Sequence, residues 1–376
     1  MSAKAPLCHI VKRGETKAGY GLLVRFVGIA LSLLVSGLVI MLLTGLNPVA
    51  VFTGIWDGAM GTEKRTWITL RDAAILLCIG FAVLPAFRMR FWNTGGEGQV
   101  LVGAAAPAAV LIYGKELPTW LLYSLCPVAG VLAGMVWGII PALFKARWNT
   151  NETLFTLMMN YIATQLVAFL IVFWENPPGS NSVGLINMKG KIGWLPKVHL
   201  PFLPKASADY VLPVMIVLVL AVCMYVYMRY AKQGYEIAVV GESENTAKYA
   251  GINVKWVIIR TMALCGAMAG LAGYLLAAGV GHTISTGLVG GRGFTAIVVA
   301  WLGKLNPFIM AVVALFLVFM QKGSVQIASQ FNMNENASEI LTGIILFFVL
   351  GCEFFIRYRL VFFHHRKQDG KEGVKA

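Results

Sequence analysis

The sequence predicts an all-α integral membrane protein with about ten transmembrane helices, and three observations support this fold class. Apolar residues make up 58% of the 376 residues and charged residues only 13%, which is more apolar surface than one soluble core buries. Stretches of about 20 apolar residues, the length that crosses a bilayer core about 30 Å thick, recur along the chain. Runs such as 211–227 lack the alternation of apolar and polar residues that a membrane β-barrel requires.

Hydropathy places the spans in order along the chain. The expected spans are Arg25–Leu46, Trp67–Phe87, Gly98–Tyr113, Thr119–Phe144, Thr153–Phe173, Tyr210–Tyr230, Trp256–Ala278, Gly293–Leu302, Pro307–Met320 and Ala337–Ile356. The eighth span is short. We expect it to be a half-helix or a tilted element that packs inside the protein.

Membrane topology explains the formal net charge of +14. Basic residues flank the apolar runs instead of forming one polar domain, so nucleic-acid binding is not expected. Many of them lie in the arm 1–24, the segment 229–255 and the tail 357–376. Because the number of spans is even, and six spans precede segment 229–255, all three lie on the same side of the membrane. Both termini are therefore expected in the cytoplasm, flanking a polytopic domain over 25–356. Segment 174–209 carries four lysines, yet this topology makes it a proline-rich external loop.

The sequence contains no signature of a cofactor or of a catalytic site. No Gly-Lys pair is followed by Ser or Thr, so the chain has no nucleotide-binding P-loop and is not expected to hydrolyse ATP itself. The five histidines and six cysteines show no spacing typical of a metal site. We also find no cluster of acidic or histidine residues of the kind that a membrane-embedded enzyme needs at one membrane face. We expect a transport subunit that is not an enzyme and binds no metal.

A polar, glycine-dense segment, Asn93 to Gln99, lies between the second and third expected spans. Its glycines let the backbone and neighbouring helices approach closely, and Glu97 at a helix start is favoured by the helix dipole. Two interpretations remain open. Either the segment is a capped cytoplasmic turn, or Asn93, Glu97 and Gln99 belong to a gate or solute pathway.

The span that begins near Asn151 carries a polar face. Asn151 or Glu152 is expected to cap this helix. Thr156, Asn160 and Thr164 follow at intervals of four residues, which places them on one side of the helix at membrane depth. Such a face points inward, where it either joins helices by hydrogen bonds or lines the path of a polar solute. Asn151, at the start of this helix, is a candidate for the same path or its gate.

The polar segment 232–255 connects the sixth and seventh spans. Within it, Ser243 is expected to cap a short helix that Gly251 ends, with Ala247 and Ala250 on one small-sided face. A compact amphipathic helix of this kind is suited to docking into a groove on a partner protein, and an ordinary surface helix has the same pattern.

A second glycine-rich helix start occurs at 290–294. It echoes the Asn93 to Gln99 segment, and transporters are often built from two related halves with the solute site between them. Arg292 is expected near the outer mouth, as an interface anchor or as a ligand-binding group. Asn306 and Pro307 indicate a turn into the ninth span.

Taken in order, these four segments resemble the permease subunits of bacterial ABC importers for simple sugars and nucleosides, a group that also includes ribose-type and branched-chain amino acid permeases. The resemblance extends from about Asn47 to Phe355. The chain departs from the pattern in places. Thr94 stands where many relatives have Ile, and Glu244 and Thr246 stand where relatives often carry Asn-Pro-Ala.

The resemblance implies partners and a location. The spans would form half of a dimeric pore with a second permease subunit, identical or different, in the bacterial inner membrane. A separate ABC ATPase subunit would bind ATP and Mg, and an extracytoplasmic binding protein would deliver the solute. The ATPase would contact a coupling helix with the residues Gly234, Tyr235, Glu236, Gly241, Ala247, Tyr249, Ala250 and Gly251.

We therefore predict the permease subunit of an ATP-driven importer. Its solute is expected to be polar and uncharged or nearly so, such as a nucleoside or a simple sugar, because the spans lack deep fixed charges. The alternative is an ion-coupled secondary transporter. Such a transporter would need buried coupling carboxylates, for which Glu97 is the one candidate, or an unwound cation site.

Overall fold

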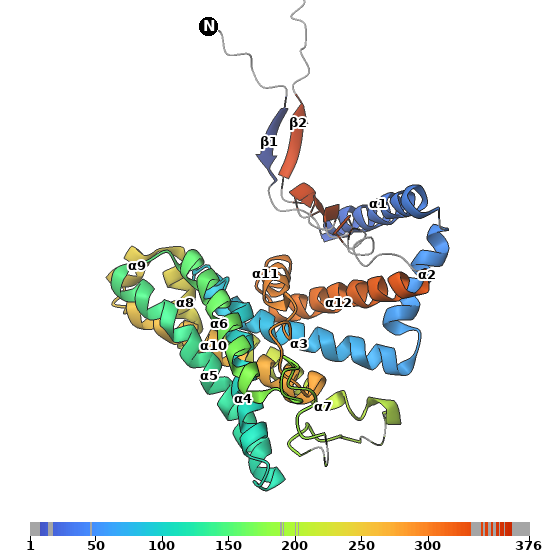
Figure 1. The fold of residues 1–376 in the computed structure, drawn as a ribbon. Helices are drawn as coiled ribbons and strands as arrows, with labels where there is room; N and C mark the ends of the chain where they lie inside the picture. The colour runs from blue at the N-terminus through green and yellow to red at the C-terminus, as the bar shows by residue number, and fades with distance from the viewer. Residues whose placement is uncertain are drawn as a thin grey trace, which may run out of the picture. The chain divides into compact units, whose positions relative to one another are not determined.

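The computed structural model divides into two compact units, residues 1–55 with 323–376 and residues 56–322. Figure 1 shows the elements by label. The structure describes residues 8–13, 18–45, 47–188, 190, 192–199, 201, 203–331, 340, 343–344, 347–348, 351–352, 354–356 and 358–362.

The first unit contains helix α1 (Ala18–Thr44) and a short antiparallel sheet. Strand β1 (Cys8–Lys12) pairs with β2 (Tyr358–Phe362), so the two ends of the chain come together. This strand pair departs from the all-helical expectation, because hydropathy reports apolar runs and not the pairing of distant five-residue segments. The expected span Arg25–Leu46 corresponds to α1, whereas half of Ala337–Ile356 lies outside the described residues.

The second unit holds most of the described helices. Helix α2 (Pro48–Met60) leads into it and α12 (Pro307–Gln330) leads out of it. Between them lie α3 (Glu63–Arg88), α4 (Gly96–Tyr113), α5 (Thr119–Trp148), α6 (Glu152–Trp174), the 3-10 turn η1 (Lys205–Ser207), α7 (Val211–Tyr230), α8 (Lys232–Glu242), α9 (Glu244–Tyr249), α10 (Val254–Leu276), the π-turn η2 (Ala277–Gly281) and α11 (Arg292–Leu302).

The helical membrane fold is confirmed. Seven helices of the described chain are long and apolar enough to cross a membrane: α3, α4, α5, α6, α7, α10 with η2, and α12. They correspond to the expected second to seventh and ninth spans. The eighth, α11, has only 11 residues, which confirms that it is short. Helix α2 was not predicted, because its 13 residues are fewer than a span requires.

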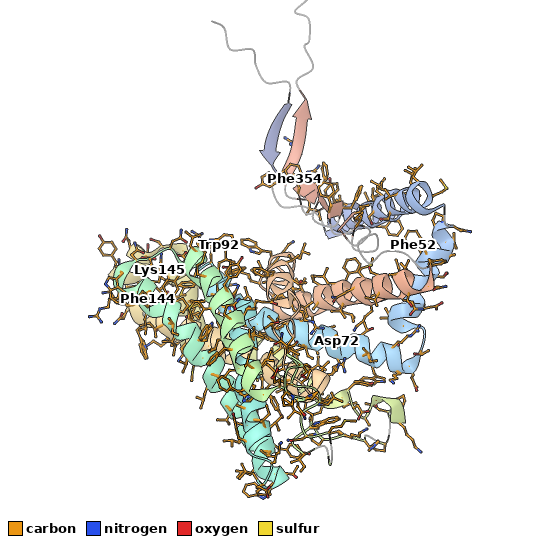
Figure 2. All side chains as sticks on the ribbon, viewed as in Figure 1. Phe52, Asp72, Trp92, Phe144, Lys145 and Phe354 are labelled. Carbon is orange, nitrogen blue, oxygen red and sulfur yellow. The ribbon has the colours of Figure 1, made fainter. Side chains whose placement is uncertain are left out.

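Helix α3 is the central helix of the second unit. Every residue from Asp72 to Phe87 is buried, and α7, α10 and α11 pack against it. A helix that is apolar on all sides is one that is surrounded by others, which agrees with the continuous apolar sequence of this segment. Figure 2 shows Asp72 on this helix.

The two ends of α3 define two faces of the second unit. Near its C-terminal end, the carbonyl of Arg88 contacts Gly241 of α8, so the α8–α9 segment lies at this end. Arg71 lies 17 residues earlier, which is about 25 Å along a helix axis. Segment 175–210 covers the opposite face, where the side-chain amide of Asn187 donates to the carbonyl of Leu111 at 2.8 Å. The amide of Ile186 also donates to the carbonyl of His282 at 2.8 Å, so this segment contacts the end of α4 and the chain that follows η2. An external position for the segment stays a prediction.

Candidate functional site

The polar segment between α3 and α4 is fastened to α6 by a buried hydrogen-bond network. The Asn160 side chain donates to the carbonyl of Thr94 at 2.9 Å and accepts from the Gly98 amide at 2.9 Å. The hydroxyls of Thr94 and Thr156 lie 3.0 Å apart. A Cβ at Gly98 would lie 3.0 Å from the Cα of Asn160, so glycine permits this approach. The turn and the helix therefore form one rigid junction.

Asn93 and Gln99 bond to each other inside this junction. Both are fully buried, and each side-chain amide donates to the other's oxygen at 3.3 Å. The Asn93 oxygen also accepts from the Gly95 amide at 3.1 Å. Buried amides need such partners, because an unpaired buried polar group destabilises the fold by about 1–3 kcal/mol. These two side chains close the turn.

Glu97 joins two helix N-termini. It lies in the first turn of α4, and its two carboxylate oxygens accept from the backbone amides of Gly291 at 2.8 Å and Gly293 at 2.7 Å, at the start of α11. The positive ends of both helix dipoles therefore face one carboxylate. A Cβ at Gly293 would overlap the Glu97 backbone, so a glycine is needed there.

This contact places Arg292 within the second unit. Arg292 is the first residue of α11, beside the Glu97 contact, and α11 runs only about 16 Å to the turn that holds Lys304. Lys304 lines the same cavity as Arg88 and Gly234, at the α8 end of the unit. Arg292 therefore lies at the end of α11 that is beside Glu97, and its expected place near an outer mouth stays a prediction. The half-helix interpretation of the eighth span is supported.

The remaining polar residues of α6 make local contacts. Asn151 caps the helix, as predicted, by accepting from the Leu154 amide at 3.1 Å. The Thr164 hydroxyl donates to the carbonyl of Asn160 one turn earlier, at 3.0 Å. Of the predicted polar face, Thr156 and Asn160 join helices, which is the first of the two interpretations. A solute-lining role for these residues stays a prediction.

The α8–α9 segment has the local structure that its sequence predicts. The Ser243 side chain caps α9 by accepting from the Thr246 amide at 3.2 Å. Gly251 follows the helix with φ +76°, a left-handed conformation that favours glycine. Figure 1 shows α8 and α9 together at one end of the unit, and Figure 2 labels Lys145 at the end of α5, where its ammonium pairs with Glu152 at 2.9 Å.

Several predicted coupling residues hold the segment in place and do not face outward. Ala247 is fully buried against a core cluster that includes Ile237 and Val240. The expectation that Ala247 and Ala250 form one docking face is therefore wrong, since Ala247 faces the core and Ala250 is exposed. Gly241 is buried against the end of α3.

Gly234 and Glu236 also serve the packing of α8. A Cβ at Gly234 would overlap the carbonyl of Tyr227, where the chain turns from α7 into α8. The Glu236 carboxylate pairs with Arg260 of α10 at 2.7 Å. The residues left for a partner are the exposed ones, with Tyr235 at 66% and Tyr249 at 94% exposure.

Two features of the second unit escaped prediction. Glycines of α5 and α10 meet at the backbone, and Trp92 stacks on Trp301 with ring centroids 5.7 Å apart. The four-residue glycine spacing was visible in the sequence, whereas the tryptophan pair comes from distant segments without a shared signal. The described residues contain no cluster of potential metal ligands.

A known transport family matches residues 66–350 of this chain. Its description is branched-chain amino acid transport system / permease component. The chain belongs to this family. The match covers α3 to α12 and therefore every contact described above for the second unit.

Individual relatives agree with this assignment. The guanosine ABC transporter permease protein NupP of Bacillus subtilis is 31% identical over 87% of this chain and 92% of its own length. The glucose ABC transporter permease protein TsgB13 of Haloferax volcanii is 27% identical over 90% of each chain. The nucleoside ABC transporter permease protein NupB of Lactococcus lactis is 24% identical, over 83% of this chain and 86% of its own. The chain is a permease subunit of an ABC transporter.

Proposed function

We propose that this permease subunit imports a nucleoside or a simple sugar, with ATP hydrolysed by a separate subunit. The observation that carries the proposal is the 31% identity with a guanosine permease over 87% of this chain. Other relatives carry nucleosides or glucose by their names. These solutes are neutral rings with several hydroxyl groups. The second unit agrees with a neutral cargo, because Asp72, its buried carboxylate, is already paired with Arg71 and Lys322.

The partner ATPase, which binds ATP and Mg, acts on the α8–α9 segment in this proposal. Tyr249 and Ala250 form the exposed end of α9, while Ala247 anchors the helix to the core. Because Ala247 is anchored in the core and the Tyr249 ring projects from the helix, a displacement of α9 by the ATPase would move the packed helices with it. Tyr235 of α8 and Gly251 after α9 are exposed as well. We assign the ATPase contact to these four exposed residues.

The other partners and the location follow from the same proposal. A second permease, identical or different, completes the pore, and an extracytoplasmic binding protein delivers the solute. The subunit lies in the bacterial inner membrane with both termini in the cytoplasm. Arg88, Arg229 and Lys304 support this orientation, because they line one cavity at the α8 end and basic residues concentrate on the cytoplasmic side.

The experiment introduces Ala250→Arg into the assembled transporter. We expect ATPase co-purification and solute uptake to fall at least tenfold, because a long charged side chain would separate α9 from its groove. Met188→Arg is the matched control, since Met188 is 66% exposed in the segment on the opposite face. Labelled guanosine and glucose serve as uptake probes. Normal co-purification and uptake in Ala250→Arg would show that α9 does not dock on the ATPase.

A further inference from the structure

A polar pocket lies at the end of α3 that is remote from α8 and α9. It has a volume of about 490 Å³, and its walls include Arg71, Tyr123, Trp194, Lys197, Tyr210 and His282. We call it the Arg71 pocket. Small-molecule sites in proteins commonly measure about 300–1,000 Å³, so a nucleoside or a monosaccharide has the right size. Several of its walls come from segment 175–210, and none of the site residues predicted from the sequence lines it.

The charges around the Arg71 pocket cancel. Arg71 donates through Nε and Nη2 to one oxygen of Asp72, at 2.9 and 2.8 Å, and Lys322 pairs with the other oxygen at 2.6 Å. Lys197 pairs with Asp209 at 2.7 Å. Each cation on the wall thus has a carboxylate beside it, and a strongly charged ligand would find no uncompensated partner. The bonds of Arg71 within the described chain leave Nη1 to donate to a neutral ligand.

Aromatic rings form the other walls. The rings of Trp194 and His282 lie nearly parallel, at 5° and 3.7 Å between centroids. The Trp194 ring is fixed further by donation from Nε1 to the carbonyl of Ile186 at 2.9 Å. The ring of Tyr210 lies 5.2 Å from the Arg71 guanidinium. Flat rings held in place beside hydrogen-bond donors are the groups that bind sugar rings and nucleobases by stacking and by hydroxyl contacts.

The backbone around the pocket is also unusual. The wall residues Gly279 and Val280 belong to the π-turn η2 at the end of α10, and such turns occur frequently at functional sites. The amide of Leu195 donates to the carbonyl of Ala278 at 3.3 Å, which seats segment 175–210 on this turn. The pocket is therefore assembled by α3, α5, α10 and the covering segment together.

We propose that the Arg71 pocket binds the transported solute, a neutral ring compound with hydroxyl groups, on the face where segment 175–210 covers the bundle. The Trp194–His282 pair stacks on the ring, and Arg71 Nη1 with the hydroxyls of Tyr123 and Tyr210 bonds the hydroxyl groups. This inference rests on the proposed nucleoside or sugar cargo. It adds a loading site within one subunit, about 25 Å along α3 from the α8 end.

The test measures binding to the purified full-length chain in lipid nanodiscs, by calorimetry and by tryptophan fluorescence. Guanosine, uridine and glucose are the probes, and guanosine monophosphate is the charged comparison. Trp194→Leu removes the stacking ring and Tyr123→Phe removes only a hydroxyl. Trp120→Leu is the matched control, because Trp120 starts α5 near Tyr123 but is 69% exposed and outside the pocket walls.

We expect one probe to bind, with the dissociation constant raised at least tenfold in Trp194→Leu, several-fold in Tyr123→Phe and unchanged in Trp120→Leu. Binding that is unchanged in Trp194→Leu and Tyr123→Phe would overturn the inference, as would a chain that binds none of the probes. Tenfold tighter binding of guanosine monophosphate than of guanosine would refute the neutral-ligand argument. Uptake by the assembled transporter is measured separately. If the binding results refute the pocket but uptake persists, the proposed import function still holds.

Discussion

The contact between α5 and α10 depends on glycines that admit no side chain. Gly130, Gly134 and Gly138 of α5 recur every four residues and face Gly266 and Gly270 of α10. A Cβ at Gly134 would overlap the carbonyl oxygen of Gly266 and would lie 2.7 Å from the Cα of Gly270. Small residues at this spacing let helix backbones touch in membranes, where packing drives association. We predict that Gly134→Ala disrupts this interface.

The size of the effect follows from the geometry. An ordinary van der Waals contact of a Cβ begins at 3.4 Å, so the two backbones must separate by about 0.7 Å at the Gly270 contact alone. Overpacking of a well-packed core costs about 1–3 kcal/mol of folding free energy. The added Cβ of Gly134→Ala meets backbone atoms, which cannot move aside as side chains do, so we expect a cost of about 3 kcal/mol. Alanine returns about 1 kcal/mol through helix propensity. The net loss of folding free energy is then about 2 kcal/mol.

The assay is thermal unfolding of the purified chain in one detergent, followed by size-exclusion chromatography with fluorescence detection. For 376 residues, an unfolding entropy of about 2.1 cal/mol/K per residue makes a loss of about 2 kcal/mol lower the midpoint by roughly 2.5 °C. Gly287→Ala is the control, because a Cβ there meets no atom within 4 Å and its φ is not in the left-handed range. A Gly134→Ala midpoint within 1 °C of the parent, or an equal loss in Gly287→Ala, would refute the close-packing argument.

Two further predictions concern the polar junction and use the same midpoint assay. Asn160→Leu leaves the Thr94 carbonyl and the Gly98 amide unpaired and should lower the folding free energy by about 2–4 kcal/mol. Thr164→Val is the control, because it removes only a bond to a backbone carbonyl within α6, and it should cost less than about 1 kcal/mol. Equal losses in the two variants would show that the Asn160 bonds do not hold the turn to α6. Glu97→Gln keeps a hydrogen-bond acceptor but removes the charge between two helix N-termini, and it should lower the folding free energy by about 1 kcal/mol. Glu97→Ala also removes the acceptor and should cost at least twice as much. Similar midpoints for the two variants would show that the hydrogen bonds from Gly291 and Gly293 contribute little to stability.

Local sequence signals predicted the local structure of the α8–α9 segment and of α6. Ser243, Asn151 and Gly251 act where caps were expected, because capping depends on residues within four positions of one another. The span order also followed from hydropathy alone, since each apolar run is long enough to identify itself. Helix α8 was missed within the same segment, because its glycines at 234 and 241 read as breaks in a helix.

Contacts between distant segments could not be predicted in this way. The resemblance between the starts of α4 and α11 suggested a repeat, but it gave no indication that Glu97 bonds to the amide of Gly291, 194 positions away. Ala247 was predicted to face a partner protein but is buried in the core, for a related reason. In a six-residue helix, small side chains do not reveal which side faces the core, and only the neighbouring Ile237 and Val240 decide it.

The Glu97 contact also bears on how the protein is energised. If Glu97 were the coupling carboxylate of a secondary transporter, it would have to exchange its proton or cation in every cycle. Both oxygens of Glu97 accept from backbone amides at the start of α11, and each bond to a charged group contributes about 1.5–3 kcal/mol. Freeing the carboxylate would forfeit both bonds and would release α11 from α4. A group that joins the starts of α4 and α11 in this way is suited to a structural role, which leaves the energy for transport to the separate ATPase of an ABC transporter.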